Sequence, residues 1–78
     1  MTGTPLPVSE PMTGEQMAGY LAREQGMHPD RAGRVVAIAR ANGLKAEPVP
    51  GGYLEIRAER QPDGSYWYTL TARTGPRA

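Results

Sequence analysis

The segment Tyr53–Arg73, YLEIRAERQPDGSYWYTLTAR, decides the fold of this 78-residue chain. Two runs that alternate apolar with polar side chains flank a Pro-Asp-Gly turn, a pattern that predicts two antiparallel strands joined as a hairpin. Opposed residues in such a pair share a face of the sheet. We therefore expect Ala58 to lie opposite Tyr68 and Ile56 to lie opposite Leu70.

The same register fixes the loop and the second face of the hairpin. It requires a loop with an odd number of residues, and a three-residue loop, Pro62–Gly64, meets this requirement, with Gly64 in a left-handed conformation. The second face is more polar and carries Trp67 beside Arg57 and Glu59. An exposed Trp among charges indicates a binding surface, although a lone Trp in so small a domain is about as often buried.

Two helices are predicted before the hairpin. The first begins at Thr13, which forms a capping-box pattern with Gln16, and ends at Gly26. The second begins around Pro29 and ends at Asn42-Gly43. Its expected buried stripe consists of Ala32, Val35, Ile38, Ala39 and Asn42.

A short strand over Leu44–Val49 follows the second helix, and Pro48 and Pro50 confine it to a sheet edge. The predicted fold class is therefore α+β, with two helices followed by a small three-stranded antiparallel sheet. We expect one domain over residues 12–73, a disordered arm over 1–11 and a flexible C-terminus over 74–78. The side chains expected in the core are Met17, Tyr20, Leu21, Val35, Ile38, Leu44, Leu54, Ile56, Tyr68 and Leu70.

Composition argues against several functional classes. The chain has no Cys and a single His, His28, so we expect no disulfide, no metal site and no cofactor. His28 is expected to cap a helix or lie on the surface. The only serines are Ser9 and Ser65, and nothing places either beside a base, so we expect no catalytic residues and no enzyme activity.

The absence of an apolar run near the roughly 20 residues of a membrane span predicts a cytoplasmic protein without membrane contact. The net charge of +1 lacks the basic excess that is usual in nucleic-acid-binding domains. The distribution of charge is more informative. Segment 29–45 contains Arg31, Arg34, Arg40 and Lys45 against a single acidic residue, Asp30.

The helical pair has the pattern of a helix-turn-helix. Leu21 and Ala22 near the end of the first helix, Gly26 in the turn and apolar positions on the second helix allow close packing. Any two helices joined by a Gly-containing turn would share much of this pattern. In a DNA-binding protein, the N-terminal end of the second helix, with Arg31 and Arg34, would contact a major groove.

Residues 18–75 resemble winged-helix regulators of the MarR type. ANGLKAEPVP is similar to the "GLV" strand that follows the recognition helix in that family, and SYWYTLTARTG is similar to its "Y-x-LT-x-x-G" wing signature. Tyr68, Leu70, Thr71 and Gly75 stand close to the signature positions. The resemblance implies a winged-helix-like fold and a small bacterial or phage regulator of transcription that binds double-stranded DNA.

The chain also departs from the family. It lacks the flanking dimerisation helices, has about a dozen extra residues over Gly51–Pro62, and carries Asp63 where a wing has a basic residue. A homodimer would double the phosphate contacts of a protein with so few cations. The nucleic-acid-binding residues that this hypothesis names are Arg31, Arg34, Arg40, Lys45, Arg57 and Arg60.

The alternative hypothesis assigns function to the hairpin. Its polar face has the Trp, Tyr and Arg content of protein-binding hot spots, which would suit a non-enzymatic interaction or inhibitor module encoded by a phage or mobile element. Stacking of unpaired bases on the same aromatic rings is a further use of this face. The partner-binding residues are then Tyr53, Arg57, Trp67, Thr69 and Arg73.

Overall fold

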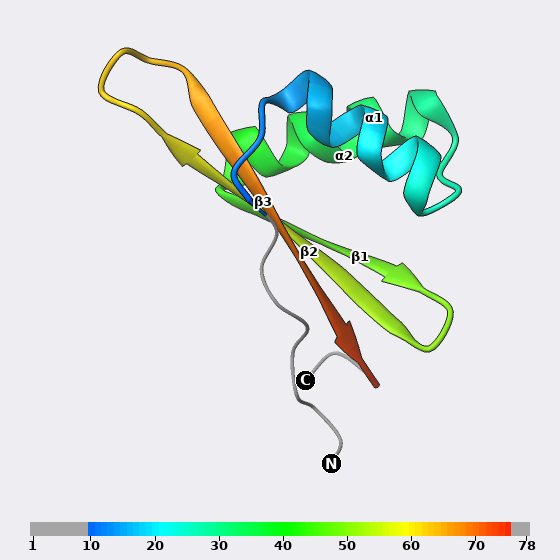
Figure 1. Cartoon of the computed structure of the whole chain (residues 1–78). Helices are drawn as coiled ribbons and strands as arrows, with labels where there is room; N and C mark the ends of the chain where they lie inside the picture. The colour runs from blue at the N-terminus through cyan, green and yellow to red at the C-terminus, as the bar shows by residue number, and fades with distance from the viewer. Residues whose placement is uncertain (1–9, 76–78) are drawn as a thin grey trace.

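Two helices precede three antiparallel strands, as Figure 1 shows for the computed structural model, which describes residues 10–75. This order confirms the predicted α+β class. Most of the predicted arm and C-terminal tail lies outside the described residues. The elements are α1 (Gly14–Glu24), α2 (Pro29–Asn42), β1 (Leu44–Val49), β2 (Gly52–Arg60) and β3 (Tyr66–Thr74).

Local hydrogen bonds explain where both helices begin. At the start of α1 the Thr13 hydroxyl accepts a hydrogen bond from the Gln16 N–H at 3.1 Å, and Gln16 Oε1 accepts from the Thr13 N–H at 2.9 Å. This is the predicted capping box. At the start of α2, His28 Nδ1 accepts from the Asp30 N–H at 3.1 Å, so His28 is the capping residue and is exposed. Gly43 ends α2 with φ of +84°.

The hairpin has the predicted register. Ala58 is paired with Tyr68, and Ile56 is paired with Leu70. The Gln61 N–H donates to the Ser65 carbonyl at 2.8 Å, which closes a loop in which Gly64 has φ of +89°. The sheet order is β1-β2-β3, so β1 is an edge strand as predicted.

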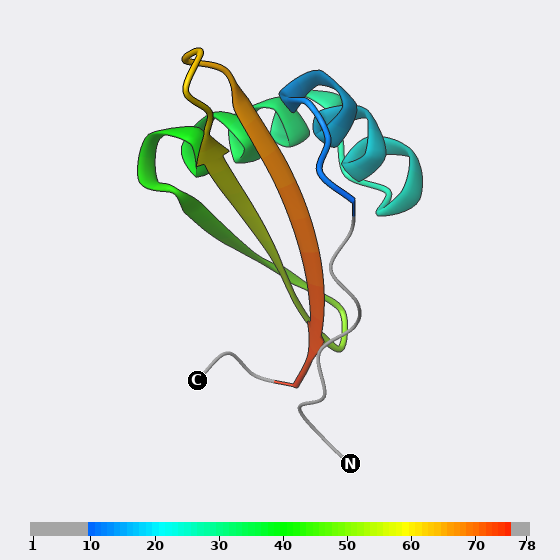
Figure 2. The ribbon, with the colours of Figure 1, turned by 60° about the vertical axis from the view of Figure 1, so that its left-hand side comes forward.

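Both helices lie on the same face of the sheet (Figures 1 and 2). Between them and the sheet lies one apolar core, to which α1, α2, β2 and β3 all contribute. Its buried side chains are Met17, Leu21, Ala32, Val35, Val36, Ala39, Leu54, Ile56, Tyr68 and Leu70. We call the sheet face that packs on this core the covered face.

The buried stripe of α2 is rotated relative to the prediction. Ile38 is 40% exposed and Asn42 is also exposed, whereas Val36 is buried. The covered face of β1 explains the difference, because it presents the charged side chains of Lys45 and Glu47. Beside these charged side chains, the side of α2 that carries Ile38 has no apolar partner. The helix is therefore oriented with Val36 in the core and Ile38 toward solvent.

Two further residues expected in the core, Tyr20 and Leu44, are half-buried rather than buried. Tyr20 lies on α1 and packs at the margin of the core cluster. Leu44 faces away from the core, because it is paired with Arg57 and neighbours on a strand alternate between faces. The sequence prediction had Leu44 fold back on the last turn of the second helix and assigned no register to β1.

Both edges of the sheet are partly obstructed. On the β3 edge, Met12 pairs with Tyr68 through two backbone hydrogen bonds of 2.8 and 2.9 Å. On the β1 edge, Lys45 Nζ donates to the Ala46 carbonyl at 2.8 Å, and Pro48 has no N–H to offer. Inward-pointing charges and proline on edge strands discourage the addition of another strand.

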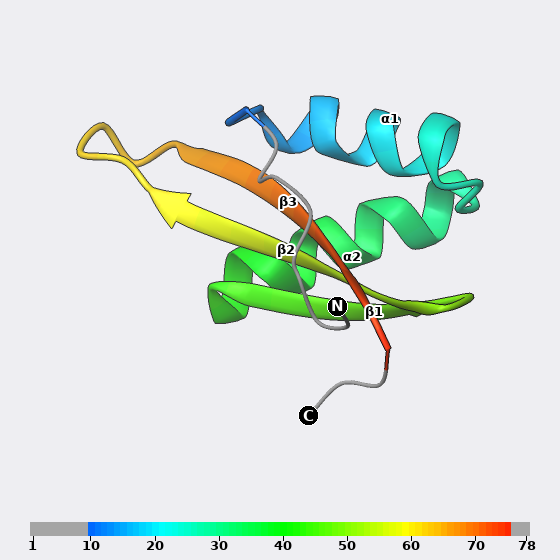
Figure 3. The same cartoon turned by 60° about the horizontal axis from the view of Figure 1, so that its bottom comes forward.

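Figure 3 shows that the β2–β3 turn reaches well beyond the helices.

Candidate interaction surfaces

The second face of the sheet, which we call the open face, has no helix over it in the described part of the chain (Figures 1 and 2). Strand alternation and register define its members. They are Leu44, Ala46 and Pro48 of β1, Tyr53, Glu55, Arg57 and Glu59 of β2, and Trp67, Thr69, Thr71 and Arg73 of β3. This surface is mixed in polarity along all three strands, whereas the buried side chains that β2 and β3 contribute to the covered face are mostly apolar.

The structure brings all five residues of the protein-binding hypothesis to the open face. Tyr53 is paired with Arg73, and Arg57 is paired with Thr69. Trp67 lies at the hairpin end of the same face and is 41% exposed. Sequence alternation had already placed these side chains on one face. The register of the hairpin therefore determines both the fold and this candidate surface.

One ion pair joins β2 and β3 on the open face, toward the end of the strands away from the β2–β3 turn. Arg73 Nε donates to Glu55 Oε1 at 2.8 Å across the β2–β3 pairing. This hydrogen bond raises the pKa of the Arg73 guanidinium above its ordinary value. Because both groups are already paired and partly shielded, Arg73 is less free to bind a partner than the exposed Arg57.

A hollow of about 360 Å³ adjoins Trp67 at the hairpin end of the open face. It is lined by Pro11, Glu59, Gln61 and Trp67. Glu59 is directly opposite Trp67 in the β2–β3 register, and Pro11 comes alongside because its neighbour Met12 pairs with β3. Sequence analysis missed Pro11 because no sequence signal predicted the pairing of Met12 with β3. It also missed Gln61, although Gln61 adjoins the predicted hairpin loop.

The basic residues of the DNA-binding hypothesis are divided between both sides of the sheet. Arg31 and Lys45 both pair with Glu47 on the covered side, where Lys45 Nζ lies 3.3 Å from Glu47 Oε1. Arg34 and Arg40 are exposed on α2. Arg57 projects from the open face instead.

Arg60, the last of the six, is paired with Tyr66 near the end of the hairpin and is exposed. By strand alternation it lies on the same side as the helices. The adjoining turn carries Asp63, whose Oδ1 accepts hydrogen bonds from the Ser65 N–H at 2.9 Å and the Ser65 hydroxyl at 2.6 Å. These bonds lower the pKa of Asp63 and give this acidic residue a role in closing the turn.

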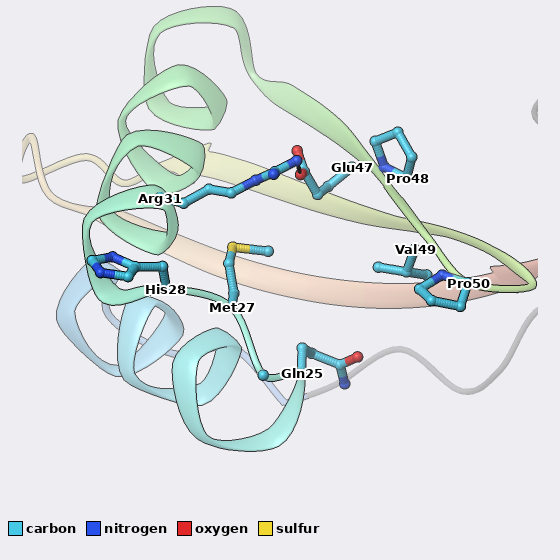
Figure 4. Close-up of a pocket in the computed structure, with 9 residues that line it drawn as sticks. Gln25, Met27, His28, Arg31, Glu47, Pro48, Val49 and Pro50 are labelled. Carbon is cyan, nitrogen blue, oxygen red and sulfur yellow. Dashed lines mark hydrogen bonds and ion pairs between the residues drawn. The ribbon is translucent and has the colours of Figure 1, made fainter.

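Glu47 is the charged residue that sequence analysis overlooked. It is 3% exposed, and Figure 4 shows the Arg31 side chain reaching toward it from α2. Together they line a depression of about 300 Å³ between the α1–α2 turn and the β1–β2 turn, with Met27 and Val49 on its walls. Alternation within LKAEPV could have identified Glu47, because it shares a strand face with Lys45 and Val49.

Within residues 10–75, no three His, Asp or Glu side chains gather in a way that could hold a metal ion. Neither helix of that range is long and apolar enough to span a membrane. No family model, curated protein or solved structure matches this chain.

Proposed function

We propose that this protein is a non-enzymatic binding module that docks a partner protein on its open face. The observation that supports this proposal best is the half-exposed Trp67 on a sheet face with no helix over it. Trp, Tyr and Arg are the residue types most enriched at the energetic centres of protein interfaces, and this face displays all three.

The state of the sheet edges also favours docking on a face. An extended peptide could otherwise bind by adding a strand to an unpaired edge. Here Met12 occupies part of the β3 edge, while Pro48 and the inward-pointing charges of β1 disfavour strand addition on the other side. The open face then remains the broad surface on which side chains of a partner can pack.

Duplex DNA remains the second candidate, and the exposure of Arg34 and Arg40 on α2 favours it. Neither side chain has a carboxylate partner among the described residues. Two features weaken this candidate. Arg31 and Lys45 are engaged by Glu47, and Arg57 lies on the opposite side of the sheet. Few phosphates can then be neutralised at once, which limits affinity at physiological salt.

Two variants distinguish the candidates. We would compare the parent protein with Trp67→Ala and Arg34→Ala for binding to random peptides displayed on phage, and to labelled duplex and single-stranded DNA at several salt concentrations. Docking on the open face predicts enriched peptides that bind the parent and Arg34→Ala but not Trp67→Ala. Duplex binding that weakens in Arg34→Ala and survives in Trp67→Ala would reject the proposal in favour of DNA recognition.

Single-stranded DNA provides the third arm of the comparison. Bases that stack on Trp67 would also lose affinity in the Trp67→Ala variant, so loss of binding alone does not identify the partner. Peptide binding without retention of the single strand supports a protein partner. Strong retention of single-stranded DNA, with no peptide enriched, contradicts it.

A further inference from the structure

The hollow beside Trp67 combines an aromatic ring with an apolar wall. The indole of Trp67 forms one side, and the ring of Pro11 comes from the segment that pairs with β3. Trp67 is anchored through its backbone in β3, and the ring of Pro11 restricts the backbone of its own segment. The hollow between them has room for a flat or extended side chain.

The remaining two walls accept hydrogen bonds. Glu59 is exposed, and its carboxylate has no cationic partner among the described residues. Gln61 Nε2 donates to the Glu59 carbonyl at 3.2 Å, an arrangement that leaves Gln61 Oε1 as an acceptor. The hollow thus offers a negative charge and an amide oxygen beside an aromatic ring.

The other acidic residue of the open face provides an internal comparison. Glu55 lies on the same strand and the same face as Glu59, but its carboxylate is already bound to Arg73. Within residues 10–75, one of these two glutamates is therefore paired with an arginine and the other is not. Arg57 lies between them in sequence and does not line the hollow.

We propose that the hollow receives an arginine side chain of the partner protein, an inference that rests on the proposed function of the open face. A guanidinium can stack on the indole of Trp67 and donate hydrogen bonds to Glu59 in the same plane. Its aliphatic stem can pack against Pro11. An acidic side chain would be repelled by Glu59, and an apolar one would leave the acceptors of Glu59 and Gln61 without partners.

Peptides selected on the parent protein provide the test. Among those that depend on Trp67, an arginine is expected at a recurrent position. Replacement of that arginine by citrulline, its neutral isostere, should weaken binding roughly 3- to 10-fold. Glu59→Gln should weaken the arginine peptide by a similar factor and leave the citrulline peptide nearly unchanged, because the two changes remove the same interaction.

Matched variants keep the result interpretable. Glu24→Gln removes an exposed carboxylate from α1, on the other side of the sheet, and should leave peptide affinity within about twofold. Glu59→Gln changes one exposed atom group, and circular dichroism will show that it folds as the parent does. Trp67-dependent peptides that tolerate citrulline, or that ignore Glu59→Gln, would overturn the arginine assignment while the proposed function stands. If no enriched peptide depends on Trp67, both proposals fail.

Discussion

The two faces of the sheet share one backbone and differ in almost every chemical respect. On β2, Leu54 and Ile56 are buried under the helices, while Glu55 and Arg57, their neighbours in sequence, belong to the open face. The covered face therefore supplies the stability of a domain that has no disulfide to reinforce it. The open face contributes less to the core, so its side chains are available for binding.

The largest expected effect tests the covered face. Leu54→Ala should lower the free energy of unfolding by about 2–5 kcal/mol, because Leu54 is 2% exposed and its loss leaves a cavity. Ile38→Ala should lower it by about 1 kcal/mol or less, because Ile38 is 40% exposed. Urea denaturation of the two variants measures the difference. Equal losses would show that Ile38 belongs to the core after all.

The next effect tests Glu47, the buried charged residue of the covered face. Arg31→Ala removes a partner from Glu47 and leaves its buried carboxylate with Lys45 alone, so we expect a loss of about 1–3 kcal/mol. Arg34→Ala, one helical turn away and exposed, should change stability by less than about 0.5 kcal/mol. Thermal or urea unfolding measures both variants.

A third variant completes that test. Glu47→Gln should cost less than Arg31→Ala, because the two cations that lose their partner can still reach water, Arg31 being about half exposed. A larger loss in Glu47→Gln than in Arg31→Ala would contradict this account. The comparison also shows why Arg34, and not Arg31, is the residue with which to test DNA binding, since its removal leaves the fold intact.

The hairpin and the helix ends could be predicted from sequence because each depends on neighbouring residues. Alternation fixed the pairing of Ile56 with Leu70, and capping chemistry fixed the start of α1. Ile38 was misplaced because its burial depends on what β1 presents to α2, which is a tertiary matter. Pro11 was missed for the same reason, because Trp67 is distant from it in sequence. Strand alternation could have placed Glu47 beside Lys45, but its contact with Arg31 of α2 is also tertiary.

A smaller effect is expected at alkaline pH. Burial raises the pKa of the Tyr68 hydroxyl above the value of about 10 that it has in the unfolded chain. Because ionisation is then easier in the unfolded state, the stability that depends on Tyr68 is present below pH 10 and declines as the pH rises toward the folded-state pKa. Above pH 10, the free energy of unfolding of the Tyr68→Phe variant should fall less steeply with pH than that of the parent. Parallel pH profiles of the two proteins would contradict this linkage.

A small effect on stability is expected on the open face, where Trp67→Ala should cost about 1 kcal/mol. Trp67 is the only tryptophan of the chain, so its fluorescence reports on this face alone. Because Trp67 is 41% exposed, acrylamide should quench its fluorescence readily in the folded protein, with emission closer to that of indole in water than in a core.

A blue-shifted emission that resists acrylamide would mean that the open face is covered in solution. In that case the two faces would no longer differ in the property on which the binding proposal depends. Ready quenching that falls when a selected peptide is added would place the peptide on Trp67 itself.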